Sequence, residues 1–379
     1  MKIASAQVFP IRLPLKVPLV TSMGILRRRN GALLRLETQS GWVGWGEASP
    51  YPGFGLEAPA DARAAMTKAS AEMVGVEVES LEDWISFVGG WIRKFPTAMA
   101  GIETALLDLV SRSKGLPLRD LLSVPGEPST SRAAIVCNAL VTGDSVETVS
   151  ASAQVAMSRG YRTFKLKVGA VDLAADIARI ACLREIVGAE SSIRLDANRA
   201  YQPEDAIEAI ESFARYEIEY LEEPLAVSAL DQMLELRERA VIPLAADESA
   251  TTEVAAARVI EAGAADVIVI KPSAAGGPFA GLRVARAARR AGLRVVVTSL
   301  IDSAVGVSAA RETAAAIAGE GELLACGLAT GDLFERDVAA LERSTDGNLM
   351  LSKEPGLGIE LCESVVRGLS SSLVENRSE

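Results

Sequence analysis

The chain has 379 residues, 49% of them apolar and 23% charged, a composition typical of a globular protein with room for two domains and one large core. Its formal net charge of −11 argues against a nucleic-acid partner, and no run reaches the ~20 uncharged apolar residues that a membrane span needs. The absence of histidine excludes Ser-His-Asp and Cys-His nucleophile systems, histidine bases and His-ligated zinc, so any general base must be Lys, Asp, Glu, Tyr or Cys.

The cysteines and the N-terminus indicate the compartment. The four cysteines are scattered and form no C-x-x-C pair, which fits a reducing cytosol and argues against a disulfide framework or a structural zinc site. The first residues lead into no long apolar core, so the sequence predicts no secretory signal. We therefore expect a cytoplasmic protein.

The first part of the chain is predicted to be an α+β capping domain at residues 1–128. It begins as a β meander from Ile3 to about Gly53, which includes two runs joined by a hairpin at 38–40. Helical periodicity then marks residues 59–73, 81–94 and 98–114. A stretch rich in proline and glycine at 124–129 indicates the domain boundary.

A glycine-bearing, basic segment at residues 20–29 interrupts the meander and is expected to be a loop. It has two interpretations. It is either a solvated turn, or a lid that offers hydroxyl groups and a cation to an anionic substrate. In the second case Thr21, Ser22 and Arg29 are the candidate substrate-binding residues.

After this domain, short apolar runs alternate with amphipathic stretches of helical length, which is typical of a parallel sheet covered by helices. The predicted strands are 133–140, 163–168, 193–198, 220–224, 244–249, 266–272, 294–300 and 323–328. The predicted helices are 146–159, 172–186, 203–215, 229–239, 252–262, 279–291 and 307–318. A spacing of roughly 25 to 30 residues between strands predicts a (β/α)7β TIM-like barrel. We place it at residues 129–340. A C-terminal segment, 341–379, is expected to return to the cap, with a strand at 348–351 and a short helix near 360–367.

Charged residues end five successive barrel strands. Side chains two apart on a strand share a face, which pairs Lys165 with Lys167, Asp196 with Asn198, and Asp247 with Ser249. At Glu222-Glu223 the two carboxylates must diverge. In a closed barrel these strand ends meet on the face that holds the active site. Carboxylates from three strands in one partly desolvated mouth repel one another, which favours a bound divalent metal ion, most plausibly magnesium.

The lysines suggest proton transfer. Lys165 and Lys167 close together near a metal ion are expected to lower each other's pKa, and a lysine whose pKa falls toward neutrality can remove a proton from carbon. Lys271 ends the sixth strand, across the barrel from Lys167. Each of these residues taken alone also has a structural interpretation. The lysine pair could be a solvated surface feature, an acidic residue could be a helix cap, and Lys271 could serve only in an ion pair.

The Lys-x-Lys motif and the lysine across the barrel resemble the muconate-lactonising branch of the enolase superfamily, over nearly the whole chain. The resembling motifs are Gly-Trp-Gly-Glu at 44–47, residues 101–109, Arg-Leu-Asp-Ala-Asn at 194–198, Leu-Glu-Glu-Pro at 221–224, Asp-Glu-Ser at 247–249 and Ile-Lys-Pro at 270–272. Within the branch the motifs, together with the segment 299–306, are most similar to those of the o-succinylbenzoate synthases.

The resemblance implies a role for each candidate residue. It makes Asp196, Glu222 and Asp247 the Mg²⁺ ligands, and the choice of Glu222 over Glu223 rests on it alone. It makes Lys167 the acid/base and Lys165 its electrostatic neighbour. Lys271 would stabilise the enolate from the opposite face. The remaining candidates are Asn198, Glu223 and Glu248, behind the metal ligands, and Ser299, toward the substrate.

The implied reaction is the dehydration of 2-succinyl-6-hydroxy-2,4-cyclohexadiene-1-carboxylate to o-succinylbenzoate, in menaquinone or phylloquinone synthesis. The partner would be this small carboxylate substrate, and the oligomeric state stays open. Alternatives in the same superfamily are an N-succinylamino acid racemase and a dipeptide epimerase. Residues 327–332 lack the Asp-x-Asp that dipeptide epimerases share, which counts against the latter. A more remote alternative is a barrel that binds without catalysis.

Overall fold

The N-terminal region of the computed structural model, which describes all residues except 22–23, 78–82, 84–93, 124–132, 332 and 376–379, is an antiparallel meander. Its strands are β1 (Ile3–Thr21), β2 (Gly24–Thr38) and β3 (Val43–Ala48), in the order β1-β2-β3. In β1, Phe9, Ile11 and Leu13 are buried at every second position, so one face of the strand packs into the core. The predicted meander and its hairpin at 38–40 are confirmed.

The prediction of a loop at residues 20–29 is wrong. The β1–β2 ladder continues through Leu19↔Leu26 and Val20↔Ile25 to Thr21↔Gly24, so Arg29 lies inside a strand. The physical reason is that β-branched and apolar residues on both arms favour a paired strand over a solvated turn. The tip of this hairpin, Ser22 and Met23, lies outside the described residues.

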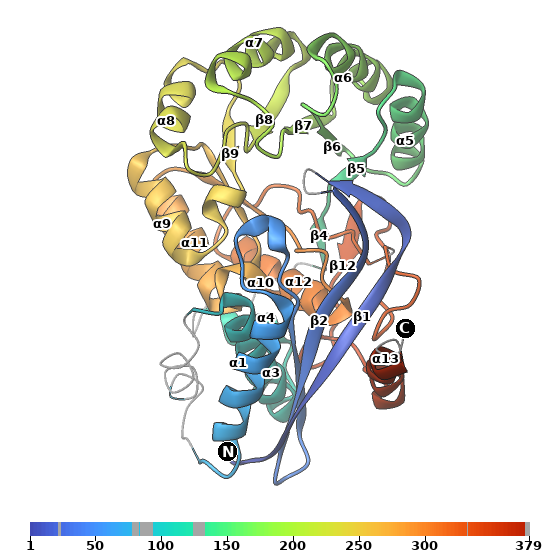
Figure 1. The fold of residues 1–379 in the computed structure, drawn as a ribbon, viewed down its shortest axis with the longest axis vertical. Coiled ribbons are helices and arrows are strands. Elements are labelled where there is room, and N and C mark those ends of the chain that lie inside the picture. The colour runs from blue at the N-terminus through green and yellow to red at the C-terminus, as the bar shows by residue number, and fades with distance from the viewer. Residues whose placement is uncertain (22–23, 78–82, 84–93, 124–132, 332, 376–379) are drawn as a thin grey trace.

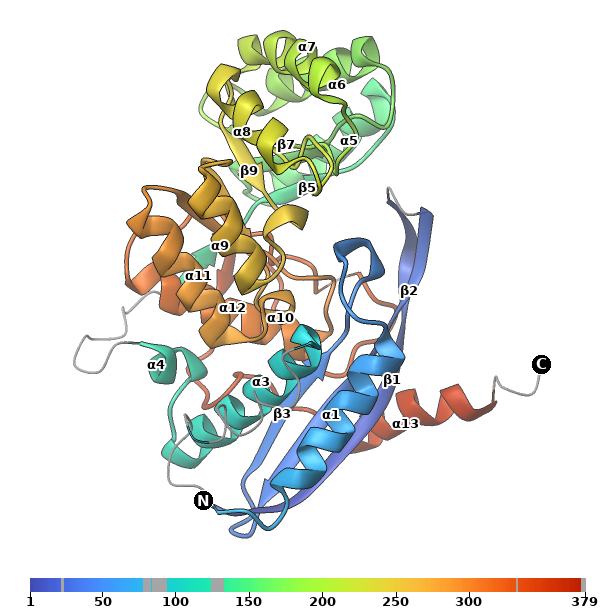
Figure 2. The same cartoon turned by 60° about the vertical axis from the view of Figure 1, so that its left-hand side comes forward.

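Helices α1 (Pro59–Met73) and α3 (Pro96–Lys114) pack on one face of this sheet (Figures 1 and 2). A Cβ atom on Gly46 would lie 1.8 Å from the carbonyl oxygen of Gly101, so the glycine lets α3 approach the backbone of β3 directly. The helix expected at 59–73 is confirmed, and the one expected at 98–114 begins two residues earlier, at a proline suited to a first turn. The helix expected at 81–94 lies outside the described residues, apart from Asp83 and Lys94.

Seven parallel strands form a second, curled sheet, with neighbours in sequence order (Figure 1). They are β5 (Ala139–Val141), β6 (Thr163–Lys167), β7 (Ser192–Asp196), β8 (Ile218–Glu222), β9 (Leu244–Ala246), β10 (Val267–Ile270) and β11 (Arg294–Val297). The helices between and after them are α5 (Val146–Ser158), α6 (Leu173–Val187), α7 (Pro203–Phe213), α8 (Leu230–Arg239), α9 (Glu253–Ala262), α11 (Pro278–Arg290) and α12 (Ala304–Gly319). Short helices α4 (Leu118–Leu122) and α10 (Pro272–Ala275) were not expected.

Two parallel bridges close the sheet into a barrel. Cys326 pairs with Cys137 and Gly327 pairs with Thr298, so the segment expected as the last strand joins both edges through single bridges and not through a ladder. Fully buried Arg194 reinforces this closure, because it donates to the carbonyl oxygen of Ala325 at 2.5 Å from across the barrel. The α/β fold with a TIM-like barrel and an α+β cap is confirmed.

The strand expected at 133–140 is divided in two. Residues Ala134–Val136 form β4, which pairs antiparallel with β12 (Asn348–Met350), and β5 starts only after Asn138. The last helix, α13 (Glu363–Glu375), lies against β1, where Ser370 donates to the carbonyl oxygen of Pro10 at 2.7 Å. The C-terminal segment thus contacts the cap on the sheet face opposite α1 and α3 (Figure 2). No described helix is long and apolar enough to cross a membrane.

Candidate active site

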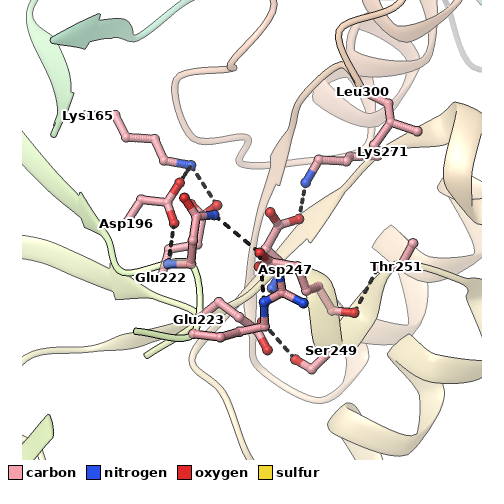
Figure 3. Close-up of polar contacts among 12 residues, drawn as sticks. Lys165, Asp196, Glu222, Glu223, Asp247, Ser249, Thr251, Lys271 and Leu300 are labelled. Carbon is pink, nitrogen blue, oxygen red and sulfur yellow. Dashed lines mark hydrogen bonds and ion pairs between the residues drawn. The ribbon is translucent and has the colours of Figure 1, made fainter. Parts of the chain in front are cut away.

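The carboxyl ends of five neighbouring barrel strands bring the predicted site residues together (Figure 3). Lys165 and Lys167 come from β6, Asp196 from β7 and Glu222 from β8. Asp247 and Lys271 directly follow β9 and β10. The in-register pairs Lys167↔Asp196 and Asp196↔Glu222 place these side chains at one level of the sheet. The predicted constellation therefore forms from strand alternation and register alone.

Lys165 lies between two of the candidate metal ligands. Its Nζ is 2.6 Å from Oε1 of Glu222 and 2.9 Å from Oδ2 of Asp196. Burial lowers the pKa of Lys165, but the two carboxylates outweigh it and raise the pKa well above the ordinary value of 10.5. The expectation that its pKa is lowered is wrong for this arrangement, because two anions and not a second cation are its nearest charges.

Lys167 has a different environment. Its side chain is 43% exposed, its Nζ donates to Oδ1 of Asn198, and it lies 3.8 Å from Oδ2 of Asp196. The lysine assigned as acid/base is therefore the one open to the barrel mouth. A solvent-accessible amine near a carboxylate cluster can meet a substrate from that side.

Lys271 approaches the carboxylates from the side opposite Lys165 (Figure 3). Its Nζ donates to Oδ1 of Asp247 and lies 4.4 Å from the centroid of the Phe54 ring. Phe54 belongs to a short turn, η1 (Pro52–Phe54), of the cap. Phe54 is not among the site residues predicted from the sequence. Its only local signal is that it follows the last strand of the cap, and contact with the barrel depends on the tertiary fold.

The three residues assigned behind the ligands hold the site together. Oε2 of Glu223 accepts hydrogen bonds from the Asp247 backbone N–H at 2.7 Å and from Oγ of Ser249 at 3.0 Å. Oε1 of Glu248 accepts from Nδ2 of Asn198 at 3.2 Å. The ends of β7, β8 and β9 are therefore cross-linked below the candidate ligands.

The backbone departs from regular geometry at these strand ends. Asn198, Arg199 and Glu223 have φ values of 42°, 69° and 40°, in the left-handed region that residues other than glycine rarely adopt. The turn at Glu223 explains how adjacent glutamates diverge, since Glu222 faces Lys165 while Glu223 faces Asp247. Backbone strain of this kind clusters at functional sites.

The carboxyl groups differ in the direction in which their pKa values are shifted. Asp196 faces two lysines, which outweigh the opposite effect of burial and lower its pKa. Burial raises the pKa of Glu222 to about 8 despite Lys165, with Asp196 adding to the effect. Burial also raises the pKa of Glu223 to about 7 and that of Glu248 to about 8. Because burial disfavours the ionised form of these glutamates, more positive charge than the lysines supply is needed to keep them ionised.

These residues fit a hard divalent cation. As they stand, with the lysines among them, no three acidic side chains in the described part of the chain converge closely enough to hold a metal ion. The donor set is nevertheless three buried carboxylates with oxygen atoms only, as magnesium prefers. Oε2 of Glu222 is buried and has no hydrogen-bond partner, so one ligand oxygen has unused capacity.

The candidate substrate-binding residues are less uniform. Arg29 is buried and donates to the carbonyl oxygens of Ser49, Pro50 and Ile301, so its guanidinium links the cap to the segment after β11. Ser299 is buried and its Oγ lies 2.9 Å from Oγ1 of Thr330. Ser22 and the side chain of Thr21 lie outside the description. Substrate contact by these four residues stays a prediction.

Comparisons with known proteins agree with this geometry. Residues 3–123 match the family model "Mandelate racemase / muconate lactonizing enzyme, N-terminal domain", and residues 148–365 match "Enolase C-terminal domain-like". The chain is 27% identical to N-succinyl-L-Arg/Lys racemase of Bacillus cereus over 98% of both chains, and the solved structure of that enzyme superposes with a TM-score of 0.89 at 26% identity over 98% of both chains.

Two further relatives differ in the reaction named. A hydrophobic dipeptide epimerase of Enterococcus faecalis is 30% identical over 83% of this chain and 88% of its own. Its structure with Mg and the dipeptide L-Leu-L-Tyr has a TM-score of 0.86 at 27% identity, covering 97% of this chain and 99% of its own. The o-succinylbenzoate synthase of Thermobifida fusca is 38% identical over 216 residues, or 56% of this chain and 65% of its own. With both domains matched and lysines and carboxylates gathered at the barrel mouth, the chain belongs to the enolase superfamily.

Proposed function

We propose that this chain abstracts the proton α to a carboxylate, and that its reaction is the racemisation of an N-succinylamino acid. The observation that carries the proposal is that Lys271 meets Asp247 on the side of the carboxylate cluster opposite Lys165 (Figure 3), while Lys167, on the same face of β6 as Lys165, lies 3.8 Å from Asp196. Racemisation needs an acid/base group on each face of the reacting carbon. The racemase of Bacillus cereus, similar over 98% of both chains, supports this choice over the dehydration favoured by the sequence motifs.

Asp196, Glu222 and Asp247 would hold a magnesium ion. When bound, the ion supplies Lewis-acid polarisation of the substrate carboxylate, which makes the α-proton more acidic. A relative in complex with Mg supports the identity of the metal. In the absence of substrate, Lys165 bridges Asp196 and Glu222 and offsets part of their charge.

The lysines carry the proton transfer. Nζ of Lys167, in its neutral form, accepts the α-proton from one face, and the ammonium of Lys271 donates a proton to the other face. The opposite enantiomer reacts with the two roles exchanged, so the substrate neither gains nor loses atoms in either direction. Asn198 orients the Lys167 amine, while Asp247 and the Phe54 ring orient the Lys271 amine.

Dehydration to o-succinylbenzoate is the second candidate. It is favoured by the 38% identity with the synthase of Thermobifida fusca, which covers 56% of this chain, and by the motif at 299–306. In that reaction Lys167 removes the α-proton and returns it to the departing hydroxyl, and Lys271 stays cationic. Both candidate substrates carry a succinyl group. A dipeptide is disfavoured, because residues 327–332 lack an Asp-x-Asp.

The deciding experiment compares three reactions on the purified enzyme with magnesium and with a chelator. We expect kcat/KM for racemisation of N-succinylamino acids to exceed that for the dehydration and for dipeptide epimerisation. Solvent deuterium should enter the α-position of both enantiomers. A faster dehydration would make the second candidate the function. Absence of magnesium-dependent exchange with every substrate would favour a binding protein.

A further inference from the structure

Two oppositely charged residues of α6 are buried behind the candidate catalytic lysines. Asp176 is 0% exposed and Arg179 is 3% exposed, and the guanidinium of Arg179 donates to the carboxylate of Asp176. Neither residue faces the carboxylate cluster. Charged side chains are rarely buried to this extent without a specific partner or task.

The pair holds the backbone at the end of β6 from both directions. Nη2 of Arg179 donates to the carbonyl oxygen of Lys167 at 3.0 Å. Oδ2 of Asp176 accepts from the backbone N–H of Gly169 at 2.7 Å. Nη1 of Arg179 donates to the carbonyl oxygen of Gly143 at 2.8 Å, two residues after the end of the neighbouring strand β5. One ion pair thus fixes the chain on both sides of Val168.

The ion pair acts where strand β6 loses its pairing with β5. The β5–β6 ladder ends at Val141↔Leu166, so Lys167 is the first residue of β6 without a partner on β5. The chain then turns at Gly169, whose φ is +82°, and a Cβ there would lie 2.4 Å from Cβ of Ala200. The backbone of Lys167 is therefore held by the β7 ladder on one side and by the side chain of Arg179 on the side where β5 has ended.

We infer that Asp176 and Arg179 are positioning residues, which aim the Lys167 amine by fixing its own backbone; this inference rests on the proposed function. The Lys167 side chain is 43% exposed, and Oδ1 of Asn198 holds its amine while the backbone holds its other end, so a shift of this backbone moves the amine relative to the carboxylates. Proton transfer is sensitive to such placement, because a misplacement of ~1 Å can cost ~10²-fold in rate. Lys271, on the opposite side, is not carried by this segment.

The test removes both charges together, since deleting one would leave the other buried and unpaired. The variant is D176L/R179M, and R179K tests whether charge without the planar fork suffices. The matched control is R119M/E312L, which removes the ion pair of Arg119 and Glu312 between α4 and α12, with an N–O distance of 2.9 Å and side-chain exposures of 12% and 4%. Both pairs are largely buried, and the control pair binds no barrel strand end that carries a lysine.

The readout is α-proton exchange in D2O for each enantiomer, with K167A and K271A identifying which enantiomer each lysine serves. In D176L/R179M we expect exchange by Lys167 to fall ~10- to 100-fold, while exchange by Lys271 stays within about threefold of the wild type. In R179K, the rate of exchange by Lys167 should lie between the rates of the wild type and of D176L/R179M. R119M/E312L should leave the ratio of the two exchange rates unchanged. An unchanged ratio in D176L/R179M would overturn the inference.

A second readout separates this inference from the proposed function. In D176L/R179M, hydrogen exchange of the segment 163–169 should quicken, and acetylation of Lys167 by acetic anhydride should change relative to exposed Lys353, whereas the control variant should alter neither. If these changes occur in a protein without racemase activity, the proposed function fails and the positioning of Lys167 stands. If segment 163–169 is unaffected, the positioning role fails whatever the reaction is.

Discussion

The ring of Phe54 in the cap lies 4.4 Å from Nζ of Lys271 in the barrel. Phe54 in turn packs edge-on against Tyr51 at 5.7 Å, and the guanidinium of Arg29 lies 5.2 Å from the Tyr51 ring. Because Arg29 also donates to the carbonyl oxygen of Ile301 at 3.1 Å, a continuous series of contacts joins the cap to two segments of the barrel. The cap is therefore part of the site and not only a cover.

This contact gives the first prediction. Phe54→Leu keeps an apolar side chain but removes the ring face, a cation–π contact worth roughly 0.5–2 kcal/mol. We expect a fall of about 2- to 30-fold in the α-proton exchange that Lys271 performs, with little effect on exchange by Lys167. Exchange rates of separate enantiomers measure this difference. Phe54→Tyr keeps the ring and should behave as the wild type. Equal losses for both enantiomers would contradict a specific contact with Lys271.

The second prediction concerns the metal ion. Asp196→Asn is nearly isosteric but removes a buried carboxylate that two lysines keep ionised. We expect magnesium binding, measured by calorimetry, to be lost or severely weakened, with the circular dichroism spectrum unchanged. Asp231→Asn, at an exposed position of α8, is the matched control and should bind magnesium normally. Full activity after exhaustive chelation would contradict the assignment of a metal site.

The third prediction separates the two lysines. Lys167→Ala should lower turnover by ~10²–10⁴-fold with magnesium still bound, because a general base is lost. If the reaction is racemisation, Lys167→Ala and Lys271→Ala should each retain proton exchange with one enantiomer only, and with opposite enantiomers. Mass spectrometry of each enantiomer in D2O tests this. Near-normal turnover by Lys167→Ala would show that its assigned role is wrong.

The strand ends could be predicted because their signals are local. Period-two alternation placed Lys165 and Lys167 on one face, and successive parallel strands then had to bring Asp196 and Glu222 beside them. The extended hairpin at residues 20–29 could not be predicted with the same ease. Its glycine and arginines suit a turn, and only pairing with the partner strand determines that the segment is extended. The contact of Phe54 with Lys271 was out of reach, because it depends on how two domains pack.

The direction of the Lys165 pKa shift also could not be predicted from the sequence. The sequence places a second lysine two residues away, which predicts mutual repulsion. In the structure the carboxylates have the larger effect on this pKa, because Oε1 of Glu222 and Oδ2 of Asp196 lie 2.6 Å and 2.9 Å from the Lys165 Nζ. Asp176 and Arg179 were likewise part of a predicted helix, but nothing in helical periodicity indicates that they hold the Lys167 and Gly169 backbone.

Glu103 is a buried carboxylate where the cap meets the barrel, away from the lysines. It lies on α3, is 1% exposed, and its Oε1 accepts from the backbone N–H of Phe279 at 2.7 Å, in the first turn of α11. Burial raises the pKa of Glu103 to about 7 from an ordinary value of 4.5, although the Phe279 N–H and Arg283 oppose the rise. The contact between the two domains is therefore expected to be sensitive to pH.

The last prediction follows from the sign of this shift. Because the folded pKa lies above the unfolded one, the contribution of Glu103 to stability is fully present below about pH 4.5 and is lost as pH rises through about 7. The side chain in Glu103→Gln stays neutral at every pH and keeps an acceptor for the Phe279 N–H. The free energy of unfolding of this variant, relative to that of the wild type, should therefore increase between about pH 5 and pH 8, by up to about 3 kcal/mol. Urea unfolding at a series of pH values measures the difference. Glu204→Gln, at an exposed position of α7, should show a much smaller trend. A difference between Glu103→Gln and wild type that stays flat across this range would mean that the carboxylate is solvated or paired more strongly than its burial indicates.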